Sequence, residues 1–328
     1  MKHSSVCPVY ILPLLCIAGA SFAQPATDYP SRPLRIVVPF GPGGNSDFAA
    51  RIISPKFSQE LGQQIIIDNR AGAGGNVGVQ VAARANADGY TLLLGNSGCV
   101  AINPSMYPDF PIRPQRDLAS VSLVVDAPGA MVVHPSVTAR NAKEFIAFAK
   151  ARPGKLDYGS TGAGSAQRLE MESFMRGAGI QLTHIPYKGG AGAVATALMG
   201  GEIQATMTSV ASVVPFAKSG RLRVIGVATP ARLAVLPDTP TLVESGFPEF
   251  TTGTWQGIYV PTGTSAAIIT RLHAVTLKVM SDNDVISRLA TAGVTPLTSK
   301  SPQEAAQFLK EQTERWAKVV KAIGVIGE

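Results

Sequence analysis

The sequence predicts an α/β protein built from two similar lobes, and three observations carry that prediction. Its 328 residues are enough for two domains of ordinary size. Hydrophobic residues make up 45% of the chain and charged residues 16%, which excludes a disordered chain and a coiled coil. Apolar runs of strand length alternate with glycine-containing turns and helix-length stretches, which is the pattern of βαβ units. Because the pattern occurs twice, we expect a sheet with covering helices in each lobe.

Each half of the chain has three predicted strands that end at polar or glycine-rich turns. In the first half the strands cover residues 34–38, 65–67 and 91–94, and their turns cover residues 39–47, 69–75 and 95–98. In the second half the strands cover residues 156–158, 182–185 and 204–207, and their turns cover residues 159–165, 186–190 and 208–209. Helices are expected after the first two turns of each half, ending near residues 61, 84, 175 and 199. The similar spacing predicts two lobes of similar construction.

The connection between the lobes is expected to run through two strands. A proline-rich stretch, residues 104–114, precedes a strand at 121–125 that crosses outward, and a strand at 131–133 then opens the second lobe ahead of a helix at 141–151. The return crossing is expected near residues 251–260. Helices at 265–280, 283–290 and 302–323 then close the first lobe, the last with Ser301 as its cap and Pro302 in its first turn. We therefore predict a discontinuous first lobe, residues 24–124 and 251–328, and a second lobe, residues 125–250.

The first residues have the layout of a secretory signal. Lys2 precedes an apolar run at residues 6–20, and a small-x-small cleavage site ends at Ala23. Pro13 interrupts the run, which is shorter than the ~20 residues that span a bilayer. We expect export and removal of residues 1–23. A lipid anchor on Cys16 is the alternative, disfavoured by the bulky leucines before it.

Charge and cysteine content limit the partners of the exported chain. The formal charge of +7 becomes +6 once Lys2 is removed, and the basic residues are scattered with only 6% aromatic residues to stack on bases. We therefore expect no nucleic-acid partner, and instead a mild attraction for anionic solutes. Cys99 is then the one cysteine left and cannot form an intrachain disulfide. Its expected role is buried packing.

Two turns, one in each half, have the composition of an anion site. Ligands of open parallel sheets bind where strands end and helices begin, and a helix start offers unpaired N–H groups and a partial positive charge. For a single loop, glycine that merely closes a tight turn is the simpler explanation; the matched pair favours two facing sites that clamp a small carboxylate. The contributing residues are Gly43, Gly44, Asn45 and Ser46 in the first half, and Ser160, Thr161, Gly162, Gly164 and Ser165 in the second.

Other chemical motifs are absent from the sequence. There is no phosphate-loop motif, Val77 interrupts a dinucleotide-binding spacing in the loop that starts at Gly72, and Cys99 interrupts a nucleophile-elbow pattern around Ser97. His134, His184 and His273 belong to no metal-ligand spacing. We therefore predict no catalytic residue, no metal and no cofactor.

Seven segments resemble those of the Bug family, the periplasmic TctC-like solute receptors of tripartite tricarboxylate transporters. They occur in order from about Tyr29 to the C-terminus, and they lie at residues 39–47, 69–75, 88–93, 103–107, 158–165, 186–189 and 236–241. The resemblance implies a two-lobe periplasmic binding protein fold, type II-like. It also implies a monomer that closes by a hinge on a small organic anion, a mono- or dicarboxylate or an amino acid, and delivers it to membrane transporter subunits.

The resemblance also implies which positions hold the ligand. By position, the first turn contributes Phe40, Gly43, Gly44, Asn45 and Asp47, and the second contributes Ser160, Thr161, Gly162, Gly164 and Ser165. Backbone amides, hydroxyls and ordered water would grip a carboxylate there. Asp47 has two interpretations of equal weight: a helix-cap carboxylate, or a contact to a ligand's ammonium or hydroxyl group.

Five further residues are candidates for the ligand cleft. The family usually has His-Leu where this chain has Arg168-Leu169; Arg168 either reaches the cleft to hold a second carboxylate or pairs with Glu172 at i+4. Ser97 and Ser209 end the third strand of each half and are expected to line the cleft. Tyr187 and Trp255 could stack on a ligand, but core packing is the expected role of both.

Two alternative functions share this architecture. An exported hydrolase could use Ser97 or Ser160, but it needs a His or Lys base beside the serine, and the sequence offers no obvious one. A ligand sensor would pass its closed state to a signalling partner, and its sequence would look the same. We expect binding without turnover.

Overall fold

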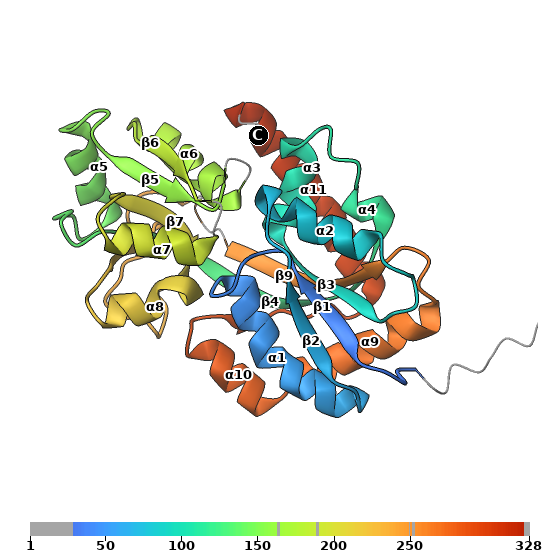
Figure 1. Cartoon of the computed structure of the whole chain (residues 1–328). Coiled ribbons are helices and arrows are strands. Elements are labelled where there is room, and N and C mark those ends of the chain that lie inside the picture. The colour runs from blue at the N-terminus through green and yellow to red at the C-terminus, as the bar shows by residue number, and fades with distance from the viewer. Residues whose placement is uncertain (1–28, 163–164, 188–189, 249, 251–252, 325–328) are drawn as a thin grey trace, which may run out of the picture.

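The computed structural model describes residues 29–162, 165–187, 190–248, 250 and 253–324, so the predicted signal segment lies outside the described residues. Within the described residues the strands form one ten-stranded sheet, in the order β2-β1-β3-β9-β4-β7-β5-β6, with β10 and β8 each pairing with β4. Figure 1 shows this sheet divided between two lobes, with β4 and β9 running between them.

The first lobe begins with three parallel strands and the helices that connect them. These elements are β1 (Leu34–Val38), α1 (Asn45–Leu61), β2 (Ile65–Asn69), α2 (Asn76–Ala83) and β3 (Thr91–Asn96). β1 lies between β2 and β3. Since all three strands are parallel, their C-terminal ends meet at one edge of the sheet, as the βαβ pattern predicts. Short helices α3 (Asn103–Met106) and α4 (Pro114–Asp117) follow.

The connection to the second lobe is one strand of 16 residues, β4 (Leu118–Val133), where the sequence predicts two. Its first part pairs with β9 (Gly253–Pro261) and β10 (Thr295–Pro296), and its last part with β7 (Ala205–Ser209) and β8 (Arg223–Val227). Pro128 and Gly129, residue types that often end a strand, remain part of the paired strand β4. Pro128 lies opposite Gly253 of β9, and Gly129 lies opposite Ser209 of β7. Register shifts along β4 mark where the strand is irregular and can bend.

The second lobe repeats the arrangement of the first. Its elements are α5 (Ala142–Lys150), β5 (Asp157–Ser160), α6 (Ala166–Ala178), β6 (Thr183–Pro186), α7 (Ala191–Met199), β7, α8 (Val210–Lys218) and β8. β5 is parallel to both β6 and β7. Sequence reasoning missed α8 and β8, because Pro215 inside the short α8 looks like a helix breaker.

The chain then returns and closes the first lobe with three helices. They are α9 (Ala266–Met280), α10 (Asn283–Ala290) and α11 (Pro302–Ile323), close to their predicted ranges. The side chains of Ser265, Asp282 and Ser301 each accept a backbone N–H at the start of one helix, which satisfies groups that the helix itself leaves unpaired. α9 and α10 pack against α1, and α11 packs against β4.

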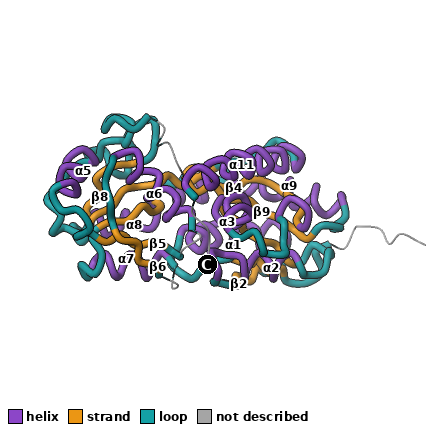
Figure 2. Tube along the Cα trace, turned by 90° about the horizontal axis from the view of Figure 1, so that it is seen from above, coloured by secondary structure: helices purple, strands orange, loops and turns teal. Residues whose placement is uncertain are grey.

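Helices cover both faces of the sheet in each lobe, as the view from above shows (Figure 2). The buried side chains form four apolar clusters, two built mainly from first-lobe elements and two from second-lobe elements. Each lobe thus has its own core on either face of its sheet, and the loops at the strand ends are left to face the other lobe. Among the described residues we find no helix with the length and apolar character needed to cross a membrane.

Candidate functional site

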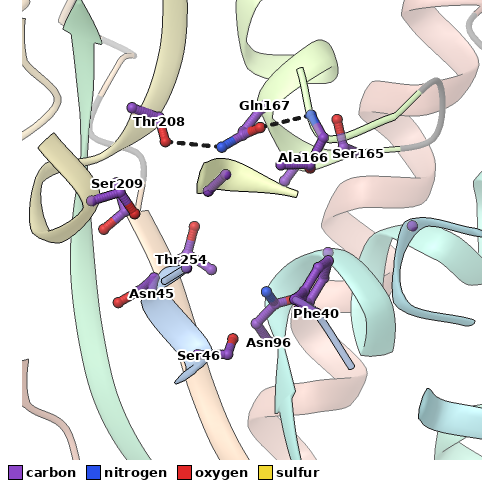
Figure 3. A pocket seen from close by; sticks show the side chains of 16 residues that line it. Phe40, Asn45, Ser46, Asn96, Ser165, Ala166, Gln167, Thr208, Ser209 and Thr254 are labelled. Atoms are coloured by element: carbon purple, nitrogen blue, oxygen red, sulfur yellow. Dashed lines mark hydrogen bonds between the residues drawn. The ribbon is translucent and has the colours of Figure 1, made fainter. Parts of the chain in front are cut away.

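A cavity with about 580 Å³ of empty space, part of it open to solvent, lies where the loops of the two lobes meet. We call it the polar cavity, because ten of its lining residues have hydroxyl or amide side chains and none of the described lining residues is charged. Figure 3 shows these side chains converging from both lobes. The lining residues are Phe40, Gly44, Asn45, Ser46, Gly74, Asn96, Gly98, Thr161, Ser165, Ala166, Gln167, Ala191, Thr208, Ser209, Ser212 and Thr254.

Four helices begin at the polar cavity. Gly44, Ser165 and Ser209 are the caps of α1, α6 and α8, and Ala191 is the first residue of α7; all four line the cavity. No side chain of the described residues caps α1 or α7. Each helix start presents backbone N–H groups and the positive end of the helix dipole. The cavity is therefore electrostatically suited to an anion even though none of the described lining residues has a cationic side chain.

Three side chains in the cavity have buried polar atoms with no hydrogen-bond partner among the described residues. These atoms are the amide nitrogen and oxygen of Asn45 and the hydroxyl oxygens of Ser46 and Ser212. Asn45 is 9% exposed and Ser46 2% exposed, so burial costs these groups their water without a replacement bond. Unsatisfied donors gathered at one cavity indicate a place for a polar ligand.

Gln167 is a lining residue that sequence reasoning missed. Its Oε1 accepts a hydrogen bond from the backbone N–H of Thr161 at 2.9 Å, and its Nε2 donates to the Thr208 hydroxyl at 2.9 Å (Figure 3). One amide thus joins the β5–α6 turn to β7. The available signal was its position, two residues after the cap Ser165, where a side chain lies beside the helix start.

The structure brings seven of the predicted residues together at the polar cavity: Phe40, Gly44, Asn45, Ser46, Thr161, Ser165 and Ser209. Gly162 lines a neighbouring cavity. Gly164 lies outside the described residues. The remaining predicted residues are absent from the described lining of the polar cavity: Gly43, Asp47, Ser97, Ser160 and Arg168.

Asp47 is a buried carboxylate that is bonded within the first lobe. Its Oδ2 accepts from the Gly43 N–H at 3.0 Å and from Arg51 Nε at 2.9 Å, and its Oδ1 accepts from Asn69 Nδ2 at 3.2 Å. Burial alone would raise the pKa of Asp47, but the bonds from Arg51, Gly43 and Asn69 together lower it below its ordinary value. These contacts match the capping interpretation, since they hold the turn that leads into α1.

Ser160 is fully buried at the end of β5, directly beneath the second turn. Its hydroxyl donates to the Gly162 carbonyl at 2.9 Å, accepts from the Gly162 N–H at 3.2 Å, and lies 2.6 Å from His184 Nε2. Sequence reasoning finds no base beside Ser160, and the structure corrects this. Parallel pairing of β5 and β6 sets His184 opposite Tyr158, two residues before Ser160 on the same face of the sheet.

The surroundings of His184 favour the neutral form of its imidazole. Burial first, and then the nearby positive charge of Arg168, lower the pKa of His184 to about 4. Arg168 lies on α6 with its Nε 3.8 Å from Glu172 Oε1, the i+4 contact that was one of its two interpretations. Glu172 in turn accepts from the Tyr158 hydroxyl at 2.6 Å. Arg168 thus contributes to a polar network behind the second turn.

The other sequence candidates pack in the core or at the surface. Trp255 is 6% exposed, with its ring 5.1 Å from that of Phe308, and the Tyr187 hydroxyl donates to Glu202 at 3.5 Å. Cys99 is buried, and burial raises the pKa of its thiol to about 12, so it is an inert packing group. Within the part of the chain that the structure describes, no three His, Cys, Asp or Glu side chains are placed to hold a metal ion.

Comparison with known proteins agrees with this architecture. The model of the tripartite tricarboxylate transporter family receptor matches residues 49–325. Protein BugT of Bordetella pertussis is 36% identical over 311 residues, which cover 94% of this chain and 95% of BugT. These matches confirm the resemblance to the Bug family.

Solved structures match along nearly the whole chain. The periplasmic binding protein BugD is 30% identical with a TM-score of 0.87, covering 92% of this chain and 100% of its own. A Rhodopseudomonas palustris protein with adipate is 31% identical with a TM-score of 0.87, covering 91% of this chain and 99% of its own. These structural similarities confirm the predicted two-lobe periplasmic binding protein fold. The family model matches most of the chain, and BugT matches it almost from end to end. The chain therefore belongs to the receptor family of the tripartite tricarboxylate transporters.

Proposed function

We propose that this protein captures a small carboxylate in the polar cavity and delivers it to a membrane transporter. The observation that carries the proposal is the set of buried, unpartnered groups of Asn45, Ser46 and Ser212 at the meeting point of four helix starts. A carboxylate has the acceptor oxygens that these donors lack, and the helix starts favour its negative charge. The adipate-bound relative supports a carboxylate as the ligand class.

The binding residues contribute in two ways. Asn45, Ser46, Thr161, Ser209 and Ser212 offer side-chain or backbone groups to the ligand directly or through water. Gly43, Asp47 and Ser160 act behind them: the Asp47 contacts hold the first turn, and the Ser160 contacts hold Gly162 in the second. Arg168, whose Nε lies 3.8 Å from Glu172 Oε1, would support the second turn from α6.

Ligand capture would proceed by hinge closure of two lobes, residues 24–124 with 251–328 and residues 125–250. β4 and β9 are the described strands that run between the lobes. The polar cavity takes residues from both lobes, since Asn45 comes from α1 and Gln167 from α6. A ligand that bonds to both turns therefore favours the closed arrangement over the open one.

We infer binding without turnover. Ser160 is fully buried, and its hydroxyl hydrogen bonds to the Gly162 carbonyl. His184 Nε2 lies 2.6 Å from the Ser160 oxygen, and which of the two atoms donates depends on the tautomer of His184. A hydrolase would need a serine hydroxyl that is accessible to a substrate.

In this proposal the protein is exported and acts together with membrane proteins. Removal of residues 1–23 would release the mature chain into the periplasm as a monomer, where transporter subunits receive the ligand. A sensor that reports its closed state to a signalling protein would use the same cavity. Binding partners of the ligand-loaded and ligand-free protein, captured by cross-linking in the periplasm, distinguish these two roles.

The direct test is to identify and then restore the ligand. Purified protein is denatured, small molecules that are released are identified by mass spectrometry, and carboxylates are screened for thermal stabilisation. At about 100 times its Kd a true ligand should stabilise the folded state by about 2.7 kcal/mol. The compound must also be recovered unchanged after incubation. A screen in which no carboxylate raises Tm, or in which the compound is consumed, contradicts the proposal.

A further inference from the structure

One helix of the second lobe, α6, contacts both lobes. Met171, Phe174 and Met175 pack in an apolar cluster of the second lobe. Leu169 is 0% exposed in a different cluster, whose described members, apart from Leu169 and Ala166, all come from the first lobe. Because Ala166 and Leu169 are three residues apart, they lie on one face of the helix. α6 therefore has one face for its own lobe and another for the first lobe.

The partner of this second face is α11, the last helix of the first lobe. Leu169 shares its cluster with Leu309, Trp316 and Val320, which are buried residues of α11. The two helices are in contact, and the end of α11 lies close to α6 in Figure 1. A leucine of the second lobe is thus part of the core of the first lobe.

A hydrogen bond also joins the C-terminal ends of α6 and α11. Arg176, in the last turn of α6, donates from Nη1 to the Ala322 carbonyl at 2.6 Å. Ala322 lies in the last turn of α11, where carbonyl groups have no partner within the helix and the helix dipole favours a cation. Arg176 therefore caps a first-lobe helix from the second lobe.

The N-terminal end of the same helix lies at the polar cavity, where Ala166 and Gln167 are lining residues. The lobes touch there, because a Cβ atom at Gly98 of the first lobe would lie 3.8 Å from Ala166 Cβ. If the lobes rotate apart about β4 and β9 to admit a ligand, α6 moves away from Gly98 and from α11. That movement exposes Leu169 to water and breaks the bond between Arg176 and α11.

We propose that Leu169 and Arg176 are positioning residues for ligand capture, which latch α6 onto α11 when the lobes close. This inference rests on the proposed function, and it adds the contacts that hold the closed arrangement. A ligand bonded to the start of α6 and a latch on its side favour the same arrangement, so each strengthens the other. Arg176 acts at a distance, since it lies about 16 Å along the helix from the cap Ser165.

Paired variants of the intact mature protein test the latch. Leu169→Ala and Arg176→Ala each remove one contact to α11. Met171→Ala is the control for the first, because it shortens a buried side chain of the same helix that packs within the second lobe. Arg152→Ala is the control for the second, because Arg152 Nη1 donates to the Phe148 carbonyl at 3.3 Å within its own lobe.

The readout is the distance between the lobes, measured by electron spin resonance. Spin labels are attached at Lys150→Cys and Arg84→Cys, two exposed positions in different lobes, while the buried Cys99 is not labelled. Distances are measured with and without a mixture of acetate, benzoate, malate, adipate and citrate. We expect the mixture to close the labelled parent protein and both controls. The ratio of closed to open molecules should fall by about tenfold in Leu169→Ala and by about threefold in Arg176→Ala.

Calorimetry with the acid that binds most tightly should show Kd weakened in the same order, with each control within about twofold of the parent. If both variants close as their controls do, the contact between α6 and α11 is static packing, and the latch is wrong while carboxylate capture stands. If the variants bind weakly but close fully, they disturb the ligand site directly and the latch is also wrong. If the parent protein neither binds these mono-, di- and tricarboxylates nor closes with them, the proposed function itself fails.

Discussion

The hydroxyl of Ser160 and the imidazole of His184 lie 2.6 Å apart, Oγ to Nε2, beneath the β5–α6 turn. Ser160 also bonds both the N–H and the carbonyl of Gly162, so the side chain of His184 is linked through one hydroxyl to the shape of the turn. Gly162 has φ +137°, a backbone conformation that residues with side chains rarely adopt. The hydrogen bonds of this pair therefore help to hold the turn at Gly162 in this shape.

His184 should make the folded state sensitive to acid. Burial and Arg168 lower the pKa of His184 to about 4, whereas an unfolded histidine titrates near 6.5. Between these values the unfolded chain binds a proton that the folded chain does not. The contribution of His184 to the free energy of unfolding is therefore fully present above about pH 6.5, and it decreases as the pH falls toward 4. Because the ring is half-buried, solvent screening reduces the effect to the order of 1 kcal/mol.

Urea unfolding at about pH 7 and about pH 5 measures this difference. His184→Gln should lose less stability between the two pH values than the natural protein, since glutamine does not titrate. His134→Gln is the matched control, because its ring contacts Ser136 in an exposed turn away from the cavity. If the free energy of unfolding falls by the same amount between the two pH values in the natural protein and in His184→Gln, His184 is not the group that causes the acid sensitivity.

Asp47→Asn should destabilise the protein by about 1–3 kcal/mol, because it removes a buried carboxylate that accepts from Arg51, Gly43 and Asn69. The matched control is Asp284→Asn, which also begins a helix and faces an arginine at i+4. Their side chains are 5% and 75% exposed, so the control should cost less than about 0.5 kcal/mol. Denaturant midpoints compare the two. If Asp47→Asn instead weakens ligand binding without lowering stability, the side chain of Asp47 contacts the ligand.

Asn45→Ala should weaken carboxylate binding by about tenfold or more without destabilising the empty protein. The amide of Asn45 has no hydrogen-bond partner among the described residues, so its removal costs none of the hydrogen bonds within the fold. Asn69→Ala is the contrast: its amide donates to Phe40 O and Asp47, and its loss should lower stability by about 1–2 kcal/mol. Calorimetric titration and melting of the empty proteins separate the two effects. A large stability loss in Asn45→Ala would show that the amide serves the fold.

Gln167→Glu should weaken carboxylate binding by about tenfold or more, because it places a negative charge beside the anion while keeping an acceptor for the Thr161 N–H. Gln204→Glu is the matched control. Gln204 makes the equivalent pair of bonds, accepting from the Asp157 N–H and donating to the Gly201 carbonyl, but it does not line the polar cavity. Binding titrations at low and high salt measure the difference. Equal losses in both variants would mean that Gln167 acts through stability alone.

Much of the fold was predictable because it depends on local patterns. Strand 34–38 and the helices near 45–61, 266–280 and 302–323 follow from apolar periodicity, caps and glycine turns, and the structure confirms them. β4 was predicted as two strands, because the pairing of Pro128 with Gly253 is a contact with a distant part of the chain. α8 and β8 were missed because Pro215, inside the short α8, looks like a helix breaker.

The sequence by itself determined the two-lobe α/β class, the family, and the two turns from which Gly44, Asn45, Thr161 and Ser165 reach one cavity. Only the tertiary structure decided which residues of each turn face that cavity. Asp47 faces Arg51 within its own lobe, Gln167 faces inward, and His184 meets Ser160 because two parallel strands share a register. The physical reason is that composition and spacing place a residue on a turn, whereas the direction of its side chain depends on contacts made by distant parts of the chain.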